Sequence, residues 1–172
     1  ATAAVKGPLS SSRGYLAATG DTSYGYFAGG WLYEPTANNY STVDRVDYSS
    51  DTATASPKGN LNNQRYGMAG VSPFSMANPG MPTPATRSEA SGPAEYNSGY
   101  WIAGNGVGSR YHRVDFSNDT ETAGVRGNIT IAIYKLTSVS SENYAYALGG
   151  APIGPGWPYN SDNIRIDYSN DT

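Results

Sequence analysis

The chain of 172 residues contains no cysteine, which excludes disulfide bonds, thiolate catalysis and cysteine-ligated metals. Its single histidine, His112, removes most histidine-based metal sites and catalytic triads. Charged residues make up 15% of the chain and the formal net charge is −3, so there is no electrostatic basis for binding nucleic acid or an anionic membrane. No run of about 18 apolar residues occurs, and no transmembrane helix is predicted.

Glycine and tyrosine are abundant instead, with 21 glycines and 15 tyrosines. Glycine favours turns, and aromatic residues favour strands. No segment has the i, i+3, i+4, i+7 spacing of an amphipathic helix. The composition therefore predicts an all-β fold with many short strands.

One acidic hexapeptide occurs three times, and a Tyr-rich block ending in small residues precedes each copy. The hexapeptides are "DYSSDT" (47–52), "DFSNDT" (115–120) and "DYSNDT" (167–172). The Tyr-rich blocks are "YGYFAGG" (24–30), "SGYWIAG" (98–104) and "YAYALGG" (144–150). Aligning both sets divides a single segment, 1–172, into the repeat units 1–52, 53–120 and 121–172.

Each unit is expected to contain four short strands. The third of these alternates with period two, because Val46 and Tyr48 fall on one face while Arg45 and Asp47 fall on the other. A repeated four-stranded unit of about 50 residues is typical of a β-propeller blade. The sequence thus predicts three antiparallel blades that belong to a larger ring, since propellers close with about four to eight blades.

The repeat resembles the kelch motif. Gly29-Gly30 and Gly149-Gly150 match its diglycine, and Arg13 and Arg65 match its loop arginine. Ala103-Gly104 and Ile133 depart from the pattern, and the usual Trp after the turn is missing. The sequence of the repeats is also similar to that of tandem-repeat proteins of marine tailed bacteriophages. This second resemblance implies an extracellular virion protein, such as a tail-fibre appendage or decoration protein used for host attachment.

The hexapeptide is interpreted as a turn, because Asp and Ser side chains can accept backbone hydrogen bonds two residues on. The alternative is a calcium loop with Asp47, Ser49 and Asp51 as ligands, although the usual Gly and distant Glu are absent. No other cofactor is expected. The repeat arginines are expected to form buried pairs with repeat aspartates. These structural repeat residues are Arg45, Asp47, Asp51, Arg113, Asp115, Asp119, Arg165, Asp167 and Asp171.

The second unit has an insertion of about 22 residues at 73–94, "PFSMANPGMPTPATRSEASGPA". One interpretation is a surface loop that is merely tolerated, since loop length has a small entropic cost. The other is a docking loop in which Phe74, Met76 and Met81 contact a partner.

The two loops 31–42 and 151–162 combine Trp, Tyr, Pro and Asn, residue types that suit a sugar-contacting surface. In a propeller both loops would share a rim with Arg13 and Arg65. The candidate binding residues on this rim are Trp31, Tyr33, Tyr40, Trp157 and Tyr159. The alternative is that these aromatic rings pack the loops onto the blades.

A non-catalytic structural or adhesive protein is therefore favoured, with a host-surface glycan or a protein as its ligand. The alternative is a carbohydrate-active propeller enzyme, a glycosidase or lyase, assembled from Glu34, Glu95 and Asp162. His112 is expected to be structural. Other blades of a longer chain, or a further copy of this one, are expected to complete the ring. Residues 1–7 are expected to pair with a strand of the "RIDYS" type.

Overall fold

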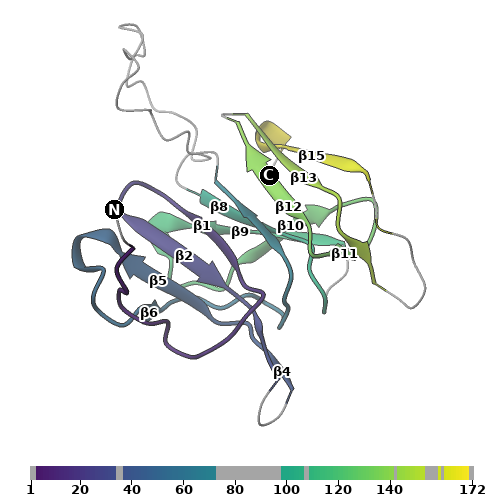
Figure 1. Cartoon of the computed structure of the whole chain (residues 1–172). Helices are drawn as coiled ribbons and strands as arrows, with labels where there is room; N and C mark the ends of the chain where they lie inside the picture. The colour runs from purple at the N-terminus through teal and green to yellow at the C-terminus, as the bar shows by residue number, and fades with distance from the viewer. Residues whose placement is uncertain are drawn as a thin grey trace, which may run out of the picture.

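The computed structural model describes residues 3–33, 37–72, 98–106, 109–141, 143–153, 159 and 161–170. In this part of the chain the secondary structure consists of short strands and three 3-10 turns, so the predicted all-β class is confirmed. The strands pair in antiparallel sheets that follow one another in chain order, as Figure 1 shows.

The first sheet has four antiparallel strands in the order β1-β2-β5-β6. They are β1 (Ala17–Gly20), β2 (Tyr24–Ala28), β5 (Val43–Asp47) and β6 (Ser56–Pro57). Between β2 and β5 the chain forms a separate hairpin of β3 (Trp31–Leu32) and β4 (Asn38–Asn39). The strand β6 belongs to the second repeat unit, so the fourth strand of the first sheet is supplied by the next unit in the chain.

The second sheet has the same antiparallel order, with four strands: β7 (Ala69–Val71), β8 (Ser98–Ile102), β9 (Arg110–Asp115) and β10 (Gly124–Asn128). The third sheet contains three: β12 (Thr137–Ser140), β13 (Tyr144–Leu148) and β15 (Asn163–Asp167). A two-stranded pair of β11 (Ile133–Tyr134) and β14 (Ala151–Pro152) lies beside them. Within the described residues, β15 is an edge strand.

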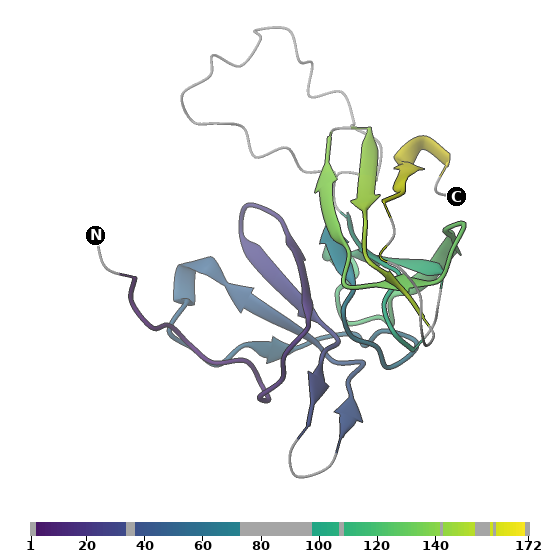
Figure 2. The same cartoon turned by 45° about the vertical axis from the view of Figure 1, so that its right-hand side comes forward.

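The strand expected over residues 1–7 is not present in the described part of that segment. Residues 3–6 lie in no strand, and Val5 is 98% exposed. The expected partner strand, β15, lies on the opposite side of the molecule from the N-terminus in both views (Figures 1 and 2). One chain alone therefore cannot make this pairing.

The second sheet lies between the other two. Its strand β7 runs beside both β1 and β12, and side-chain hydroxyls join these strands. Thr19 Oγ1 donates to the carbonyl of Val71 at 2.7 Å, and Ser138 Oγ donates to that of Gly70 at 3.0 Å. A Cβ at Gly70 would lie 2.1 Å from the Ala18 carbonyl oxygen, so this close approach requires glycine.

Two apolar cores fill the two spaces between sheets, and each contains a stacked aromatic pair. Tyr26 of the first sheet stacks on Phe116 of the second with ring centroids 4.8 Å apart. Tyr100 of the second stacks on Tyr168 of the third at 5.0 Å. Tyr26 and Tyr100 are equivalent positions in the repeat, as are Phe116 and Tyr168. The two interfaces between sheets thus share one aromatic contact.

The aromatic residue after the third strand of the sheet is buried in two units and exposed in one. Phe116 and Tyr168 are buried, whereas the equivalent Tyr48 is 52% exposed. The reason is positional: Phe116 and Tyr168 stack on Tyr26 and Tyr100 of the sheet before theirs, whereas Tyr48 belongs to the first sheet of the described chain.

Candidate functional site

The repeated hexapeptides form hydrogen-bonded turns. In each, the aspartate Oδ1 accepts from the backbone N–H and the hydroxyl of the serine two residues on, at 2.6–3.0 Å. These aspartates are Asp47, Asp115 and Asp167. The hydrogen bonds from Ser49 lower the pKa of Asp47. In the described part of the chain, no group of three or more His, Asp or Glu side chains is placed to hold a metal ion.

The last aspartate of the second hexapeptide connects two sheets. Asp119 Oδ2 accepts from Arg45 Nη1 at 2.7 Å and from the Tyr26 hydroxyl at 3.0 Å. Lys58 Nζ lies 3.6 Å from its Oδ1. Burial, together with the Asp119 carboxylate, raises the pKa of Tyr26. The first sheet therefore holds the turn that follows the second sheet's third strand.

The other repeat arginines and aspartates are placed as follows. Arg165 lies over the Tyr144 ring at 4.6 Å, as Arg45 lies over Tyr24 at 4.2 Å. Asp51 is half-exposed and pairs with Lys6 at 3.2 Å. Asp171 lies outside the described residues.

A buried ion pair joins the loop arginine of the first unit to a residue that sequence reasoning missed. Arg13 Nη2 lies 3.0 Å from Asp44 Oδ2, and both side chains are fully buried. Ser10 donates to the same carboxylate from its backbone N–H and its hydroxyl, at 2.9 and 2.7 Å. The Arg13 guanidinium also donates to the Gly29 carbonyl at 2.8 Å. The pair is hydrogen-bonded on both sides, which is the condition for burying charge at tolerable cost.

The same two positions hold a different pair in the second unit. Arg65 Nη2 contacts His112 Nε2, and both residues are fully buried. His112 Nδ1–H donates to the Ala123 carbonyl at 3.5 Å, which leaves Nε2 as the acceptor. Burial, with the nearby Arg65 charge, lowers the pKa of His112 to about 4. Burial, with the Arg110 charge, also lowers the pKa of Arg65 to about 10.

In the third unit both positions are isoleucine. Ile133 is fully buried and Ile164 packs against the same apolar core. One interface position thus holds Arg–Asp, Arg–His or Ile–Ile. The alignment of Asp44, His112 and Ile164 at a constant place in the third strand was the signal that would have found this pairing.

The diglycine positions share one backbone conformation. Gly29 and Gly149 have φ of 63° and 65°, and Ala103 at the equivalent place has φ of 58°. This left-handed region favours glycine, so the first glycine of the diglycine is explained by the positive φ that the backbone adopts there.

An exposed cluster of aromatic rings, here named the aromatic surface, lies where the three loops before β1, β7 and β12 meet. The backbone N–H of Gly67 donates to the Tyr15 carbonyl and that of Lys135 to the Gly67 carbonyl, both at 2.7 Å. The rings follow one another with centroids 5.6–6.2 Å apart. The members of the aromatic surface are Tyr15, Trp31, Tyr33, Tyr66 and Tyr134.

Polar groups accompany these rings. The Asn105 side-chain amide donates to the Tyr66 hydroxyl at 2.8 Å, and Lys135 Nζ lies 5.2 Å from the centre of the Tyr134 ring. Tyr15 and Tyr33 are exposed, while the other three rings are half-buried. Such a surface offers apolar ring faces together with hydrogen-bonding groups.

Of the predicted rim residues, the structure brings Trp31 and Tyr33 together in this surface. Tyr40 instead lies against the Arg13 guanidinium at 5.9 Å, and Tyr159 is exposed. Sequence reasoning missed Tyr15, Tyr66 and Tyr134, which lie near the loop-arginine position of each unit. Several predicted residues lie outside the described part of the chain: Trp157, Phe74, Met76, Met81, Glu34 and Glu95.

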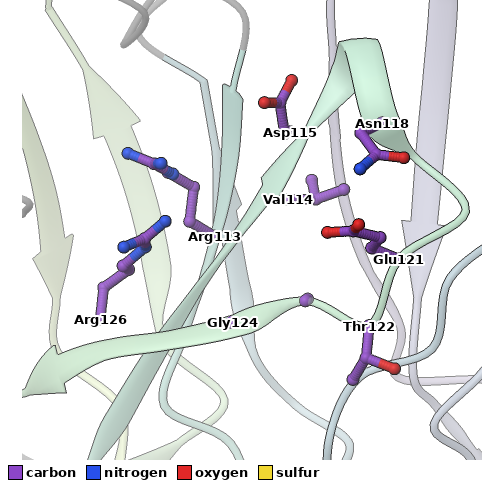
Figure 3. A pocket seen from close by; sticks show the side chains of 9 residues that line it. Arg113, Val114, Asp115, Asn118, Glu121, Thr122, Gly124 and Arg126 are labelled. Carbon is purple, nitrogen blue, oxygen red and sulfur yellow. The ribbon is translucent and has the colours of Figure 1, made fainter.

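A polar pocket of about 200 Å³ lies between β9 and β10 (Figure 3). The guanidinium groups of Arg113 and Arg126 lie on one side of it, and the side chains of Asn118 and Glu121 lie on the other. Arg113 and Arg126 are the repeat equivalents of Arg45 and Lys58, which hold Asp119. The pocket therefore corresponds to an ion-pair position of the repeat.

No family model matches the chain, and none of the curated proteins does either. In the described part of the chain, no helix has the length and apolar character needed to cross a membrane.

Proposed function

We propose that this protein is a non-catalytic adhesive protein built from kelch-like propeller blades, which binds a host-surface glycan through its aromatic surface. The observation that carries the proposal is the run of five neighbouring rings with the Asn105 amide and the Lys135 ammonium beside it. Pyranose rings present apolar C–H faces edged by hydroxyls. Exposed aromatic faces and adjacent donors match both parts of that chemistry.

The blade architecture has its own support. Two sheets have the same four-strand antiparallel order, neighbouring first strands lie side by side, and a stacked aromatic pair lies at equivalent positions in both interfaces between sheets. In a propeller, loops from successive blades converge on one face. The aromatic surface occupies such a convergence of three loops, which gives the protein one composite binding surface.

The setting we propose is extracellular, on a phage virion as an appendage or decoration protein. This setting is supported by the resemblance of the repeat sequence to tandem-repeat proteins of marine tailed bacteriophages. Mass spectrometry of purified particles tests this, with the protein expected among particle components. Detection only in host cytoplasm would contradict it.

A glycan array with the purified chain tests the binding function. We expect retention of a subset of polysaccharides, and a loss of about fivefold in affinity for Tyr33→Ala, because stacking on an aromatic face contributes about 1 kcal/mol. Val125→Ala is the control, since Val125 is an exposed apolar residue of β10 outside the aromatic surface. Equal losses in both variants, or no retention of any glycan, would contradict the proposal. Release of free sugar would favour the alternative of a carbohydrate-active enzyme.

A further inference from the structure

The outer face of the third sheet, which points away from the second sheet, exposes residues whose repeat equivalents are buried in the other sheets. Tyr146 is half-buried, whereas the equivalent Tyr26 and Tyr100 are fully buried. Val139 is 58% exposed, whereas the equivalent Val71 is 5% exposed. This face is therefore one half of the repeated interface between sheets, without its second half among the described residues.

The opposite face of the first sheet exposes the complementary half. Tyr48 is 52% exposed, while the equivalent Phe116 is 8% exposed and stacks on Tyr26. The half-exposed Asp51 carboxylate pairs with the exposed Lys6, while the equivalent Asp119 is buried against Arg45. The two outer faces thus carry the two sides of the same contact.

Within the described residues, the third sheet also has no fourth strand beside its edge strand β15, whereas the first two sheets have one. In the first sheet Ser56 and Pro57 pair with Arg45 and Asp44. In the second, Gly124 and Val125 pair with Arg113 and His112. In the third unit, Arg165 and Ile164 are equivalent to Arg45 and Asp44. The residues equivalent to Ser56 and Pro57, which would pair with them, are Ala4 and Val5. Residues 3–6 are exposed and in no strand, so they are available for this pairing.

We propose that the outer face of the third sheet binds the first sheet of a second copy of this chain. In this interface Tyr48 stacks on the partner's Tyr146, Asp51 pairs with the partner's Arg165, and residues 3–6 add to the partner's β15 as its fourth strand. The addition of a strand to an open edge satisfies backbone groups that are otherwise unpaired. The proposal deepens the blade architecture above and is independent of glycan binding.

The number of copies follows from the number of sheets. Each copy supplies three sheets, and propellers close with about four to eight. Six, from two copies of this 172-residue chain, is the one multiple of three within that range, so a dimer is the assembly that this chain is expected to form. Its two interfaces are identical and head-to-tail, which closes the ring and leaves no free face.

Light scattering after size-exclusion chromatography tests the dimer. The wild-type chain is expected at about twice its mass of 18.1 kDa. Arg165→Glu and Asp51→Arg each place like charges at both interfaces, and each variant alone is expected to associate at least about tenfold more weakly. An equimolar mixture of the two variants restores opposite charges at both interfaces. We therefore expect the mixture to recover the dimer.

Arg126→Glu is the matched control, because it makes the same change of charge as Arg165→Glu on an exposed arginine of the second sheet, outside both faces. It is expected to remain dimeric. A monomeric wild type, an assembly of another size, or variants that stay dimeric would each overturn the proposal. So would a mixture that stays monomeric while circular dichroism shows both variants folded. A monomer that still binds glycan would overturn the dimer and leave the proposed function standing.

Discussion

The Arg65 guanidinium donates to Nε2 of His112 inside the interface between the first and second sheets, where neither side chain is exposed to solvent. No carboxylate accompanies this cation among its described contacts, and its Nε has no hydrogen-bond partner. In the first unit the equivalent arginine has Asp44. This difference makes the second unit the place where the repeat is most sensitive to pH.

Stability is expected to fall on acidification through His112. Because burial lowers its pKa to about 4, the unfolded state binds the proton more readily between about pH 6.5 and pH 4. The contribution is fully present above the unfolded pKa and is lost as the pH falls toward 4, on the order of 3 kcal/mol. Urea unfolding across this window measures it. His112→Gln keeps an acceptor for Arg65 and removes this slope; an unchanged slope would contradict the assignment.

Replacing His112 by the residue of the first unit is expected to be tolerated. His112→Asp gives Arg65 a carboxylate in the position that Asp44 has for Arg13. We expect its free energy of unfolding at neutral pH to match or exceed that of the wild type. His112→Ala, which leaves the buried guanidinium without an acceptor, should lose about 2–4 kcal/mol. Equal losses in the two variants would show that charge pairing does not govern this position.

Breaking the buried pair of the first unit is expected to be costly. Asp44→Ala leaves the Arg13 guanidinium buried and uncompensated, at about 3–5 kcal/mol. The double variant with isoleucine at both positions imitates Ile133 and Ile164 of the third unit. It is expected to regain more than half of that loss. Chemical denaturation of the three proteins gives the comparison, and a loss below about 1 kcal/mol for Asp44→Ala would count against a structural role for the pair.

The hexapeptide turns are expected to act without metal. Asp115→Ala removes the acceptor for the Ser117 N–H and hydroxyl and should cost about 0.5–2 kcal/mol, as for other capping residues. Asp115→Asn retains one acceptor oxygen and serves as the control. Thermal midpoints of all three proteins should not respond to calcium or a chelator. A calcium-dependent rise that Asp115→Ala abolishes would favour the calcium loop.

Patterns within one unit could be predicted from the sequence, because they depend on local backbone geometry. The alternation around Arg45 predicted a strand, which the structure contains. The diglycine was recognised as a repeated pattern, and the structure shows that it coincides with a positive φ at Gly29. Contacts between units were harder. Arg45 was expected to bind some repeat aspartate, but that its partner is Asp119 of the following unit depends on how the sheets pack.

The aromatic surface could not be predicted as a whole for the same reason. Tyr66 and Tyr134 occupy one repeat position, but the first unit has Gly14 there and supplies Tyr15 from the next position. An alignment of the repeats does not match Tyr15 with Tyr66 and Tyr134, because Tyr15 lies one position later. Its neighbours are set by the convergence of three loops, which only the packed structure defines.

Asp119 of the second unit is bound by Arg45 and Tyr26 of the preceding sheet, and this contact has a consequence for how such a chain can evolve. The first and second sheets each present a tyrosine and an arginine on one face, and an aromatic ring and an aspartate on the other. A duplicated unit inserted between two existing ones would meet a suitable partner on both sides without any change to its neighbours. The gene can therefore lengthen or shorten by whole units, while the loops of each new unit remain free to diverge.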